Sequence, residues 1–347
     1  MEKSNGIGRR RAAIKAIATH LPAAKLTNED LARELGEWDA PKILDKTGIG
    51  TRRVARPDEC SSDLGVAAAE RLFERTNYPP EDIDFLLFCT QSPDYFLPAT
   101  ACLVQHRLGL RTDCGAIDFN QGCSGYVYGL GLAKSLIEAG TASNVLLITA
   151  ETYSKFINPR DRSVRTIFGD GAAATLLTAV DSETELLGPF VFGTDGRGAQ
   201  ELIVPAGGMR HRVGCEQGLD RQDSSGNWRS ERNLYMNGLE IFNFTLKTVP
   251  KALDLLLQKS GRCNDQVDRF FLHQANKFML DRLRLKMKIP EEKFWIDMTD
   301  CGNTVSSTIP IALESAQARE WIHSGDTLAL VGFGVGYSWA ATLLQWV

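Results

Sequence analysis

The sequence predicts an α/β protein made of two similar halves, each built around a mixed sheet that is buried on both faces. The segments IDFLLF, NVLLIT and DTLALVG are continuously apolar rather than alternating, which is typical of strands covered by helices on both sides. With 347 residues, of which 43% are hydrophobic and 24% are charged, the chain can bury the large core of two fused domains.

An internal repeat supports this division. Residues 68–91 (AAERLFERTNYPPEDIDFLLFCTQ) align without a gap with residues 252–275 (ALDLLLQKSGRCNDQVDRFFLHQA). In each segment an apolar helix and a turn lead to an aspartate, Asp84 or Asp268, and a buried strand follows at once. Such agreement in register favours duplication over a chance likeness of two αβ units.

The boundary between the halves is expected near Asp181, with an N-terminal half of residues 1–181 and a C-terminal half of residues 182–347. The stretch from about Gly188 to Leu234 is polar and rich in glycine, and it predicts a decorated connection between the halves.

Composition excludes several classes of function. A net charge of -4 is poorly suited to binding nucleic acid, which needs a concentrated basic surface. No stretch approaches the ~20 apolar residues of a membrane span. The eight cysteines contain no CxxC pair and predict reduced thiols, hence a cytoplasmic protein. Together with the five histidines they show no metal-ligand spacing, so no metal site is expected.

Cys123 is the candidate nucleophile. It lies in GAIDFNQGCSGYVYGLGLAKSLIEAG, where a strand ending near Phe119 is followed by a tight turn and a helix closed by Gly140. The unpaired N–H groups at a helix start favour a thiolate, so a lowered thiol pKa is expected for Cys123. Gly122 and Gly125 leave room for a bulky thioester, although a small buried cysteine at such a junction is also a common structural feature.

A histidine and an asparagine are the other catalytic candidates. His273 closes the apolar strand of VDRFFLHQANKFMLDRL, and the carboxyl end of a strand is where α/β sheets place catalytic groups. Asn303 lies in the turn GNTVSSTIP, ahead of a helix with Pro310 near its start, and its amide can donate to a developing oxyanion. Taken alone, a lone histidine is more often structural, and a turn asparagine is as often structural as functional.

Two glycine-rich segments, FGDGAAATLL and GFGVGYSW, are interpreted as tight turns. GFGVGYSW, from Gly332, is followed by a short terminal strand and by no helix, so a phosphate-binding loop is not expected there. A turn whose backbone N–H groups point into a site fits better.

Together these motifs resemble the β-ketoacyl-acyl-carrier-protein synthase III family of the thiolase superfamily. QGCSGYVYGL, HQAN, GNTVSSTIP, FGDGAA, MNGLEIF and GFGVGYSW are spaced as in that family over nearly the whole chain. The resemblance implies a thiolase-like five-layered αβαβα fold from two duplicated halves, and a homodimer.

The resemblance also implies a mechanism. Cys123 would take an acyl primer from acyl-CoA, and a malonyl-thioester on acyl carrier protein or CoA would then enter and lose carbon dioxide. His273 and Asn303 would stabilise the enolate, while the backbone N–H groups of Cys123 and Val335 would form an oxyanion hole. Val335 stands where the family usually has glycine. No cofactor is implied, because the CoA thioesters are substrates.

Further contacts to CoA or carrier protein are implied at four positions. Arg162, in DRSVRTIFGDGA, matches a CoA-contacting arginine of the family, and Lys46 replaces another arginine. Asn276 and Lys277 follow the catalytic histidine candidate. Trp38 lies too far along the chain to match the family's tryptophan.

Two surface features bear on the substrates. Leu97, in SPDYFLPATAC, stands where many relatives have a phenylalanine that reaches across the dimer to floor the acyl pocket, so a primer longer or bulkier than acetyl is expected. A basic run follows HQAN and suits an acidic carrier protein, although a solvated face explains it equally well. Its members are Lys277, Arg282, Arg284, Lys286 and Lys288.

Other functions remain as alternatives. A degradative thiolase would carry a second cysteine near the C-terminus, which GFGVGYSW lacks. Hydroxymethylglutaryl-CoA synthase and plant-type polyketide synthase share the Cys-His logic in longer chains, and a specialised condensing enzyme of secondary metabolism would share the whole site. A papain-like hydrolase has the same order of Cys, His and Asn. A catalytically silent acyl-thioester-binding protein is separated from these only by an activity test.

Overall fold

The helices and strands follow the apolar runs of the chain and end at its turn residues. The computed structural model describes residues 9–36, 39–212, 214 and 218–347; Trp38 and Cys215 lie outside the described residues. The strands are β1 (Arg9–His20), β2 (Lys25–Thr27), β3 (Thr51–Arg53), β4 (Phe85–Cys89), β5 (Gly115–Phe119), β6 (Asn144–Glu151), β7 (Gly171–Ser182), β8 (Leu187–Thr194), β9 (Leu202–Ile203), β10 (Arg221–Gln222), β11 (Trp228–Arg229), β12 (Tyr235–Met236), β13 (Arg269–Leu272), β14 (Thr327–Gly334) and β15 (Ser338–Gln345). The helices are α1 (Asn28–Leu35), α2 (Ala40–Thr47), α3 (Ser61–Thr76), α4 (Thr100–Arg107), α5 (Gly125–Glu138), α6 (Arg162–Arg165), α7 (Gly238–Ser260), α8 (Lys277–Lys286) and α9 (Thr308–Ala318).

Two large mixed sheets form the framework. Within the described residues, one sheet has the strand order β1-β7-β6-β4-β5 and the other the order β13-β14-β15-β8. In the first sheet β4 runs parallel to β5 and β6, while β7 is antiparallel to β1 and β6. In the second sheet β13 runs parallel to β14, and β15 is antiparallel to β14 and β8.

The two sheets share one topology. The run β1-β7-β6-β4 repeats as β8-β15-β14-β13, with the same sequence of parallel and antiparallel pairs. Where the first sheet adds β5, the second has only a parallel bridge between Phe270 and Phe294. The second half therefore keeps a remnant of the fifth strand.

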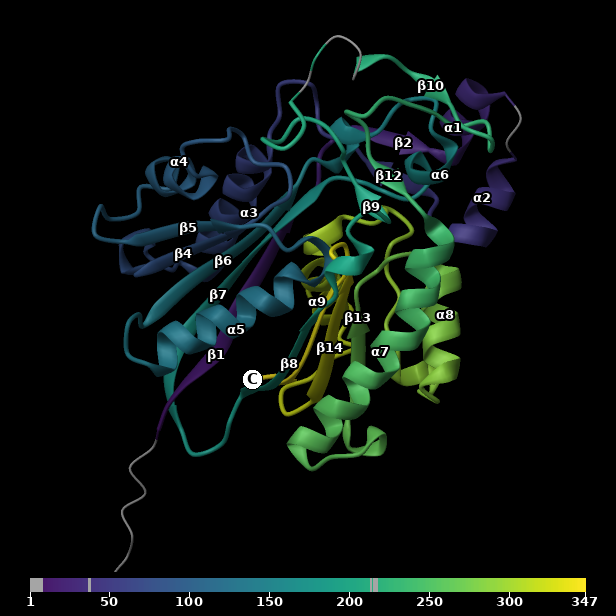
Figure 1. Ribbon diagram of the computed structural model, residues 1–347. Coiled ribbons are helices and arrows are strands. Elements are labelled where there is room, and N and C mark those ends of the chain that lie inside the picture. Colours follow the sequence, from purple (N-terminus) through teal and green to yellow (C-terminus); the bar gives the residue numbers. More distant parts are fainter. Residues whose placement is uncertain (1–8, 37–38, 213, 215–217) are drawn as a thin grey trace, which may run out of the picture.

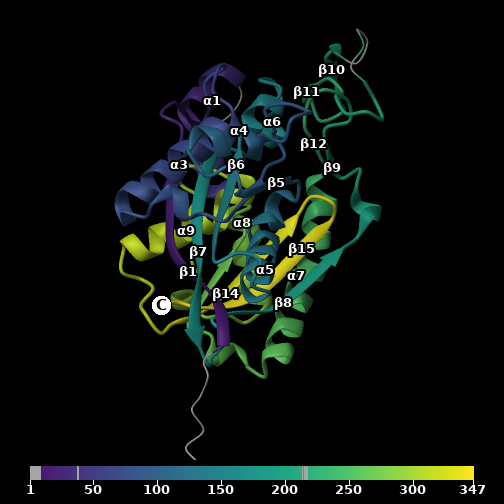
Figure 2. The same ribbon diagram turned by 90° about the vertical axis from the view of Figure 1, so that its left-hand side faces the viewer.

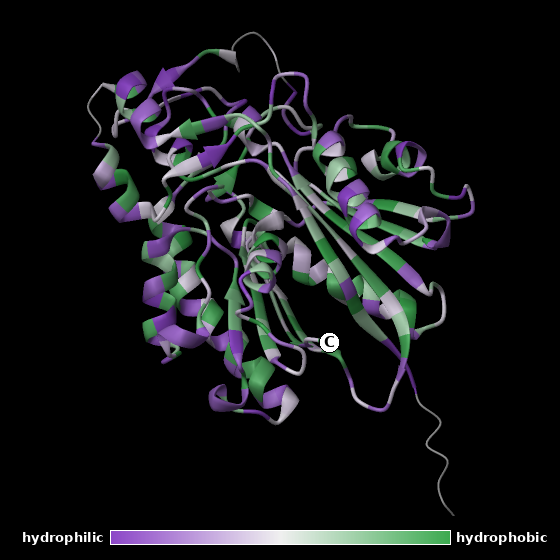
Figure 3. Cartoon of the chain, turned by 180° about the vertical axis from the view of Figure 1, so that it is seen from behind, coloured by the Kyte–Doolittle hydropathy of each residue, from purple (hydrophilic) through white to green (hydrophobic). Residues whose placement is uncertain are grey.

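Helices cover both faces of each sheet. Figure 1 shows α5 and α9 between the sheets, α3 and α4 outside the first sheet, and α7 and α8 outside the second. Three apolar clusters fill the spaces between these layers, and the middle cluster draws on both sheets and both central helices. Apolar residues accordingly follow the strands in Figure 3, while the outer helices alternate in polarity. The expected five-layered αβαβα fold is confirmed.

The continuously apolar segments are buried as expected. All eight residues of β14 are buried, as are the last seven of β6 and the last four of β4.

In the part of the chain that the structure describes, no helix combines the length and apolar character that crossing a membrane requires.

The expected connection from about Gly188 to Leu234 is wrong in its first part. Residues 188–194 belong to β8, an edge strand of the second sheet. The sequence LGPFVFGT looks like a loop because of its glycines and Pro189, but an edge strand tolerates a residue that has no N–H to donate. Only the later part, which holds the short strands β9 to β12, decorates the fold.

Candidate active site

Cys123 lies in the turn between β5 and α5, as its flanking sequence predicts. A short 3-10 turn, Gly122–Ser124, leads directly into the helix at Gly125, and Gly140 follows the end of the helix with a φ of 78°. Gly122 has a φ of 49°, a conformation that favours glycine. The side chain of Cys123 is buried, with 4% of its surface exposed.

The end of β14 presses against this turn. A Cβ atom on Gly332 would lie 2.7 Å from Cα of Ser124, and one on Gly334 would lie 2.8 Å from Sγ of Cys123. Both positions therefore require glycine, because any side chain would overlap the turn or the sulfur. The alternating glycines of GFGVG let the backbone of the C-terminal half lie against the sulfur of Cys123 in the N-terminal half.

Burial sets the protonation of the thiol. It raises the pKa of Cys123 to about 12, while the backbone N–H groups of Val335 and of Cys123 itself act in the opposite direction. The lowered pKa expected from the helix start is wrong, since desolvation outweighs these N–H contacts. The thiol therefore keeps its proton at neutral pH, and it must lose that proton as it attacks.

His273 directly follows β13, at the carboxyl end of a parallel strand. Its Nδ1 atom lies 2.7 Å from the hydroxyl oxygen of Thr308, the first residue of α9. Burial lowers the pKa of His273 to about 3, so the imidazole is neutral at physiological pH. Its ring meets the ring of Phe333 edge-on, with 5.5 Å between the centroids.

Asn303 is held in the turn before α9 by bonds on each of its polar groups. Its Oδ1 accepts from the N–H of Val305 at 2.9 Å, and its own N–H donates to the carbonyl of Ile167 at 2.9 Å. Its Nδ2 lies 3.4 Å from Nε2 of His273 and 3.4 Å from the carbonyl of Ala275. The side-chain amide is thereby aimed at the imidazole.

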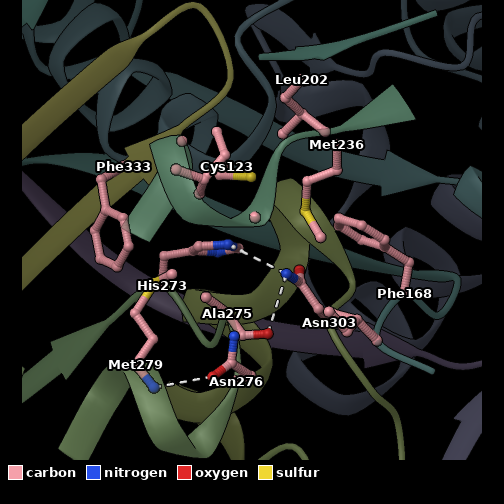
Figure 4. A pocket seen from close by; sticks show the side chains of 14 residues that line it. Cys123, Phe168, Leu202, Met236, His273, Ala275, Asn276, Met279, Asn303 and Phe333 are labelled. Atoms are coloured by element: carbon pink, nitrogen blue, oxygen red, sulfur yellow. Dashed lines mark hydrogen bonds between the residues drawn. The ribbon is translucent and has the colours of Figure 1, made fainter. Parts of the chain in front are cut away.

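These three side chains meet in one cavity of about 150 Å³. Figure 4 shows the sulfur of Cys123, the imidazole of His273 and the amide of Asn303 around a common space, with Phe168, Leu202 and Met236 along one side. The remaining lining residues are Ile167, Gly238, Ile241, Ala275, Asn276, Met279, Phe333 and Gly334. The arrangement sets a nucleophile beside two nitrogen donors in a largely apolar cavity.

Of the predicted binding residues, Asn276 lines this cavity, while Lys46 and Lys277 lie where α2 packs against α8. Asn276 lines the cavity and caps α8, where its Oδ1 accepts from the N–H of Met279 at 2.9 Å. Lys277 is ion-paired with Asp281 at 2.6 Å, and its side chain lies against Gly48 at the end of α2. Lys46 is exposed on the last turn of α2, next to α8.

Two other predicted residues, Arg162 and Leu97, lie outside these cavities, whereas Val335 lies beside Cys123. The backbone N–H of Arg162, at the start of α6, donates to Asn227 at 3.0 Å, and Arg162 lines neither the catalytic cavity nor the one beside it. Leu97, in the loop between β4 and α4, is 82% exposed and also lines neither. Val335 lines the adjacent cavity of about 320 Å³.

Comparison with known proteins places the chain in a family. Models of "3-Oxoacyl-[acyl-carrier-protein (ACP)] synthase III" and of its C-terminal part match residues 117–196 and 257–346. The chain is 37% identical over 341 residues to the β-ketoacyl-[acyl-carrier-protein] synthase III of Caldanaerobacter subterraneus subsp. tengcongensis, covering 96% of this chain and 98% of the relative. The chain belongs to the β-ketoacyl-[acyl-carrier-protein] synthase III family.

Solved structures of 3-oxoacyl-(acyl-carrier-protein) synthases agree. One crystal structure of a 3-oxoacyl-(acyl-carrier-protein) synthase III is 54% identical, with a TM-score of 0.96 over 97% of this chain and 100% of that one. The synthase from Burkholderia xenovorans LB400 is 35% identical, with a TM-score of 0.88 over 98% and 96% of the two chains. This synthase III is thus an acyltransferase of the condensing type, and its thiolase-like fold excludes the papain-like alternative.

Several residues that shape the synthase III site were not singled out from the sequence. Thr308 contacts His273, and Gly334 clears space beside the sulfur. Glu151 is wholly buried nearby, and the oxygens of its carboxyl group accept from Ser306 at 2.8 Å and from the N–H of Gln91 at 3.0 Å. The motifs GNTVSSTIP and GFGVGYSW contain Thr308, Ser306 and Gly334, but Glu151 and Gln91 carry no local signal.

Proposed function

We propose that this synthase III transfers an acyl primer from acyl-CoA to Cys123 and extends it by decarboxylative condensation with a malonyl-thioester. The observation that carries the proposal is the meeting of the Cys123 sulfur with the nitrogens of His273 and Asn303 in one buried cavity. A buried nucleophile and two buried donors in a largely apolar cavity suit acyl transfer followed by carbanion chemistry.

In the first step the sulfur of Cys123 attacks the carbonyl carbon of the acyl-CoA thioester. The carbonyl oxygen becomes an oxyanion and accepts hydrogen bonds from the N–H groups of Cys123 and Val335, which already contact the thiol. The bond to the CoA sulfur then breaks, and CoA leaves as a thiol with the proton that Cys123 gives up. Because burial raises the pKa of Cys123 to about 12, loss of this proton accompanies the attack.

In the second step a malonyl-thioester enters beside His273 and Asn303. Its carboxylate leaves as carbon dioxide, and the bonding electron pair forms an enolate whose oxygen accepts from Nε2 of His273 and Nδ2 of Asn303. These nitrogens are 3.4 Å apart, so one oxygen can accept from both. Nε2 must carry the proton in this step, so the Thr308 hydroxyl, which donates to the carbonyl of Val305 at 3.1 Å, must turn to donate to Nδ1 at 2.7 Å. The enolate carbon attacks the acyl-enzyme, and Cys123 leaves as a thiolate.

Acyl carrier protein is the proposed carrier of the malonyl group, and the exposed face of α8 is its proposed docking surface. Lys277, Arg282 and Lys286 are exposed on this face, and Arg282 lies 5.3 Å from the centre of the Phe278 ring. Arg284 points elsewhere, because it pairs with Glu291 at 3.3 Å and is 18% exposed. Arg282→Glu and Lys286→Glu should raise the KM for malonyl carrier protein and leave the KM for malonyl-CoA unchanged.

A homodimer is the proposed assembly. Ile117, Leu132 and Phe192 expose 44%, 42% and 48% of their surfaces on β5, α5 and β8. Helix α5 lies beside both strands (Figure 2), because Gly129 packs against Phe119 of β5 and Gly131 packs against Phe192 of β8. An apolar face across three elements is typical of a surface that a partner covers. In such a dimer the proposed role of Leu97 is to floor the partner's acyl pocket.

The smaller Leu97 favours a primer longer than acetyl. The alternative function is that of a specialised condensing enzyme with the same site. The similarity to the priming β-ketosynthase of the R1128 polyketide pathway, at 27% identity and a TM-score of 0.85, supports this alternative. The proposed contacts to CoA remain Arg162, Lys46, Asn276 and Lys277. The proposed reaction needs no cofactor beyond its CoA thioesters, and the free cysteines of the described residues favour a reducing, cytoplasmic location.

The test is the intact mass of wild type and Cys123→Ala after incubation with acyl-CoAs from acetyl to long and branched chains. We expect wild type to gain one acyl group, Cys123→Ala to gain none, and malonyl carrier protein to remove the adduct with release of carbon dioxide. Absence of an adduct with every acyl-CoA and every acyl carrier protein would favour the catalytically silent binding protein.

A further inference from the structure

A second cavity lies on the other side of the loop that contacts the Cys123 sulfur. It has a volume of about 320 Å³, and Val335 and Gly336 form its wall toward Cys123. Leu202 lines both this cavity and the catalytic one, so the two spaces are neighbours. A volume near 300 Å³ is at the lower end of the range for small-molecule pockets.

The second cavity is where the acyl chain of the loaded enzyme must lie, an argument that rests on the proposed function. The malonyl-thioester has to occupy the catalytic cavity, because His273 and Asn303 line it. The acyl carbonyl oxygen faces the N–H of Val335, and the acyl chain therefore extends past Val335 into the space that this residue also lines. We call this space the acyl chamber.

One wall of the acyl chamber is polar. The hydroxyl of Tyr153 donates to Oε1 of Gln91 at 2.9 Å, and Nε2 of Gln91 donates to Oδ1 of Asn120 at 2.9 Å. Tyr153 is buried, Gln91 is half-buried and Asn120 is exposed, so the row runs from the interior to the opening. Gly122 makes room for it, since a Cβ atom there would lie 2.5 Å from Oε1 of Gln91.

The facing wall is apolar. Its members are Phe156, Ala199, Leu202, Ile203, Val204 and Leu234. None of the residues lining the chamber carries a charge, so an acyl group ending in a carboxylate would be buried there without a partner.

The polar row retains hydrogen-bonding capacity after its internal bonds are made. The hydroxyl of Tyr153 donates its one hydrogen bond to Gln91, and its oxygen can still accept a hydrogen bond. Within the described part of the chain, the side-chain amides of Gln91 and Asn120 each keep at least one N–H beyond the bond between them. A group that both donates and accepts, such as an alcohol, matches this row.

We propose that the acyl chamber selects a short primer acyl group that carries a hydroxyl on its hydrocarbon chain, and that Tyr153 and Gln91 determine this specificity. The hydrocarbon lies against Phe156, Leu202 and Leu234, and the hydroxyl bonds to the row from Tyr153 to Asn120. An unsubstituted acyl chain leaves the row without this hydrogen-bond partner. Because one hydrogen bond is lost, the unsubstituted donor should load ~10-fold more slowly than the hydroxylated one.

The test compares donors that differ by one oxygen atom. Butyryl-CoA and its 2-, 3- and 4-hydroxy derivatives are each incubated with the full-length enzyme, and the second-order rate of adduct formation on Cys123 is followed by intact mass. At least one hydroxybutyryl-CoA should load ~10-fold faster than butyryl-CoA. Loading of butyryl-CoA at an equal or higher rate than all three would overturn the inference.

Two variants assign the preference to the row. Tyr153→Phe and Gln91→Met should slow the preferred hydroxy donor ~10-fold more than they slow butyryl-CoA, which brings the ratio of the two rates near one. Tyr126→Phe is the matched control, because the Tyr126 hydroxyl is also buried with one partner, Thr175 at 3.3 Å, and Tyr126 lines neither cavity. A ratio that stays unchanged in Tyr153→Phe would refute the assignment.

The outcomes separate the two proposals. Butyryl-CoA loading and condensing as well as its hydroxy derivatives would leave the proposed function intact and overturn only the chamber's specificity. No loading of Cys123 by any donor would overturn both.

Discussion

The hydroxyl oxygen of Thr308 lies 2.7 Å from Nδ1 of His273 and joins the start of α9 to the end of β13. With burial lowering the pKa of His273 to about 3, the ring is neutral and has one N–H. Which nitrogen carries it depends on the partner of the other. Thr308 therefore acts as a positioning residue that decides whether Nε2 can donate to the enolate.

Thr308→Val removes the hydroxyl and keeps the shape of the side chain. We expect kcat for condensation to fall ~10-fold, since one hydrogen bond that fixes the imidazole is lost, while acyl loading of Cys123 changes less than 2-fold. Thr308→Ser should restore kcat. Stopped assays of carbon dioxide release and intact mass measure the two steps. Equal activity of the valine and serine variants would contradict this role.

At Gly332 the strand β14 packs against the cysteine turn without room for a side chain. In Gly332→Ala the new Cβ would meet Cα of Ser124 at 2.7 Å and the carbonyl of Cys123 at 3.0 Å, both of them backbone atoms. We expect a loss of ~1–3 kcal/mol in the free energy of unfolding. Gly196→Ala is the control, because nothing lies within 4 Å of its Cβ position. Urea unfolding that shows equal stability for both variants would count against the contact.

Sequence reasoning succeeded where the signal is local. The strand, turn and helix around Cys123, and the strand that His273 closes, follow from residues adjacent in the chain. It failed for β8, whose glycines and Pro189 look like a loop until the edge position is known. It also failed for the pKa of Cys123, because burial is a tertiary property that outweighs the helix start.

The parts that sequence could not supply are contacts between distant segments. Tyr153 and Gln91 are 62 residues apart, and Thr308 and His273 are 35 apart, so no motif joins them. Their pairing depends on how the strands are ordered in each sheet. The catalytic role of Cys123 remains a proposal that the loading experiment tests, and the role of His273 is a proposal that the carbon dioxide assay of Thr308→Val tests.

The internal repeat extends to individual hydrogen bonds. The N–H of Asp84 donates to the carbonyl of Asn144 at 3.0 Å, and its carboxylate accepts from the N–H of Asn144 at 3.0 Å. Asp268 makes the same two bonds with Thr327, at 2.9 and 2.8 Å. Both pairs lie at the start of an interior strand, β6 in the first sheet and β14 in the second. We propose that residues 1–181 and 182–347 arose by duplication.

Asp268→Ala tests what this bond contributes. It leaves the N–H of Thr327 without its acceptor at a half-buried site, and we expect a loss of ~1–2 kcal/mol in the free energy of unfolding. Asp265→Ala, three residues earlier at an exposed position, should change stability by less than ~0.5 kcal/mol. Chemical denaturation of the two variants against wild type is the measurement. Equal losses at both sites would show that the bond contributes nothing of its own.

Glu151 gives the fold a dependence on pH. Burial raises its pKa from 4.5 to about 8, so between these values the folded protein keeps a proton that the unfolded chain releases. The resulting stabilisation is fully present below pH 4.5, declines as the pH rises and is lost above pH 8. At about 1.4 kcal/mol per unit, the decline amounts to roughly 3–5 kcal/mol.

Glu151→Gln stays neutral and should lack this decline. We expect the free energy of unfolding of wild type, relative to Glu151→Gln, to fall steadily from pH 5 to pH 8, while Glu81→Gln at an exposed position parallels wild type. Urea unfolding at pH 5, 6.5 and 8 provides the comparison. A constant difference between wild type and Glu151→Gln would mean that the buried carboxyl does not change protonation on folding.

The Cys123 thiol should respond as well, because a charge on Glu151 disfavours the thiolate, and alkylation of Cys123 above pH 8 should be faster in Glu151→Gln.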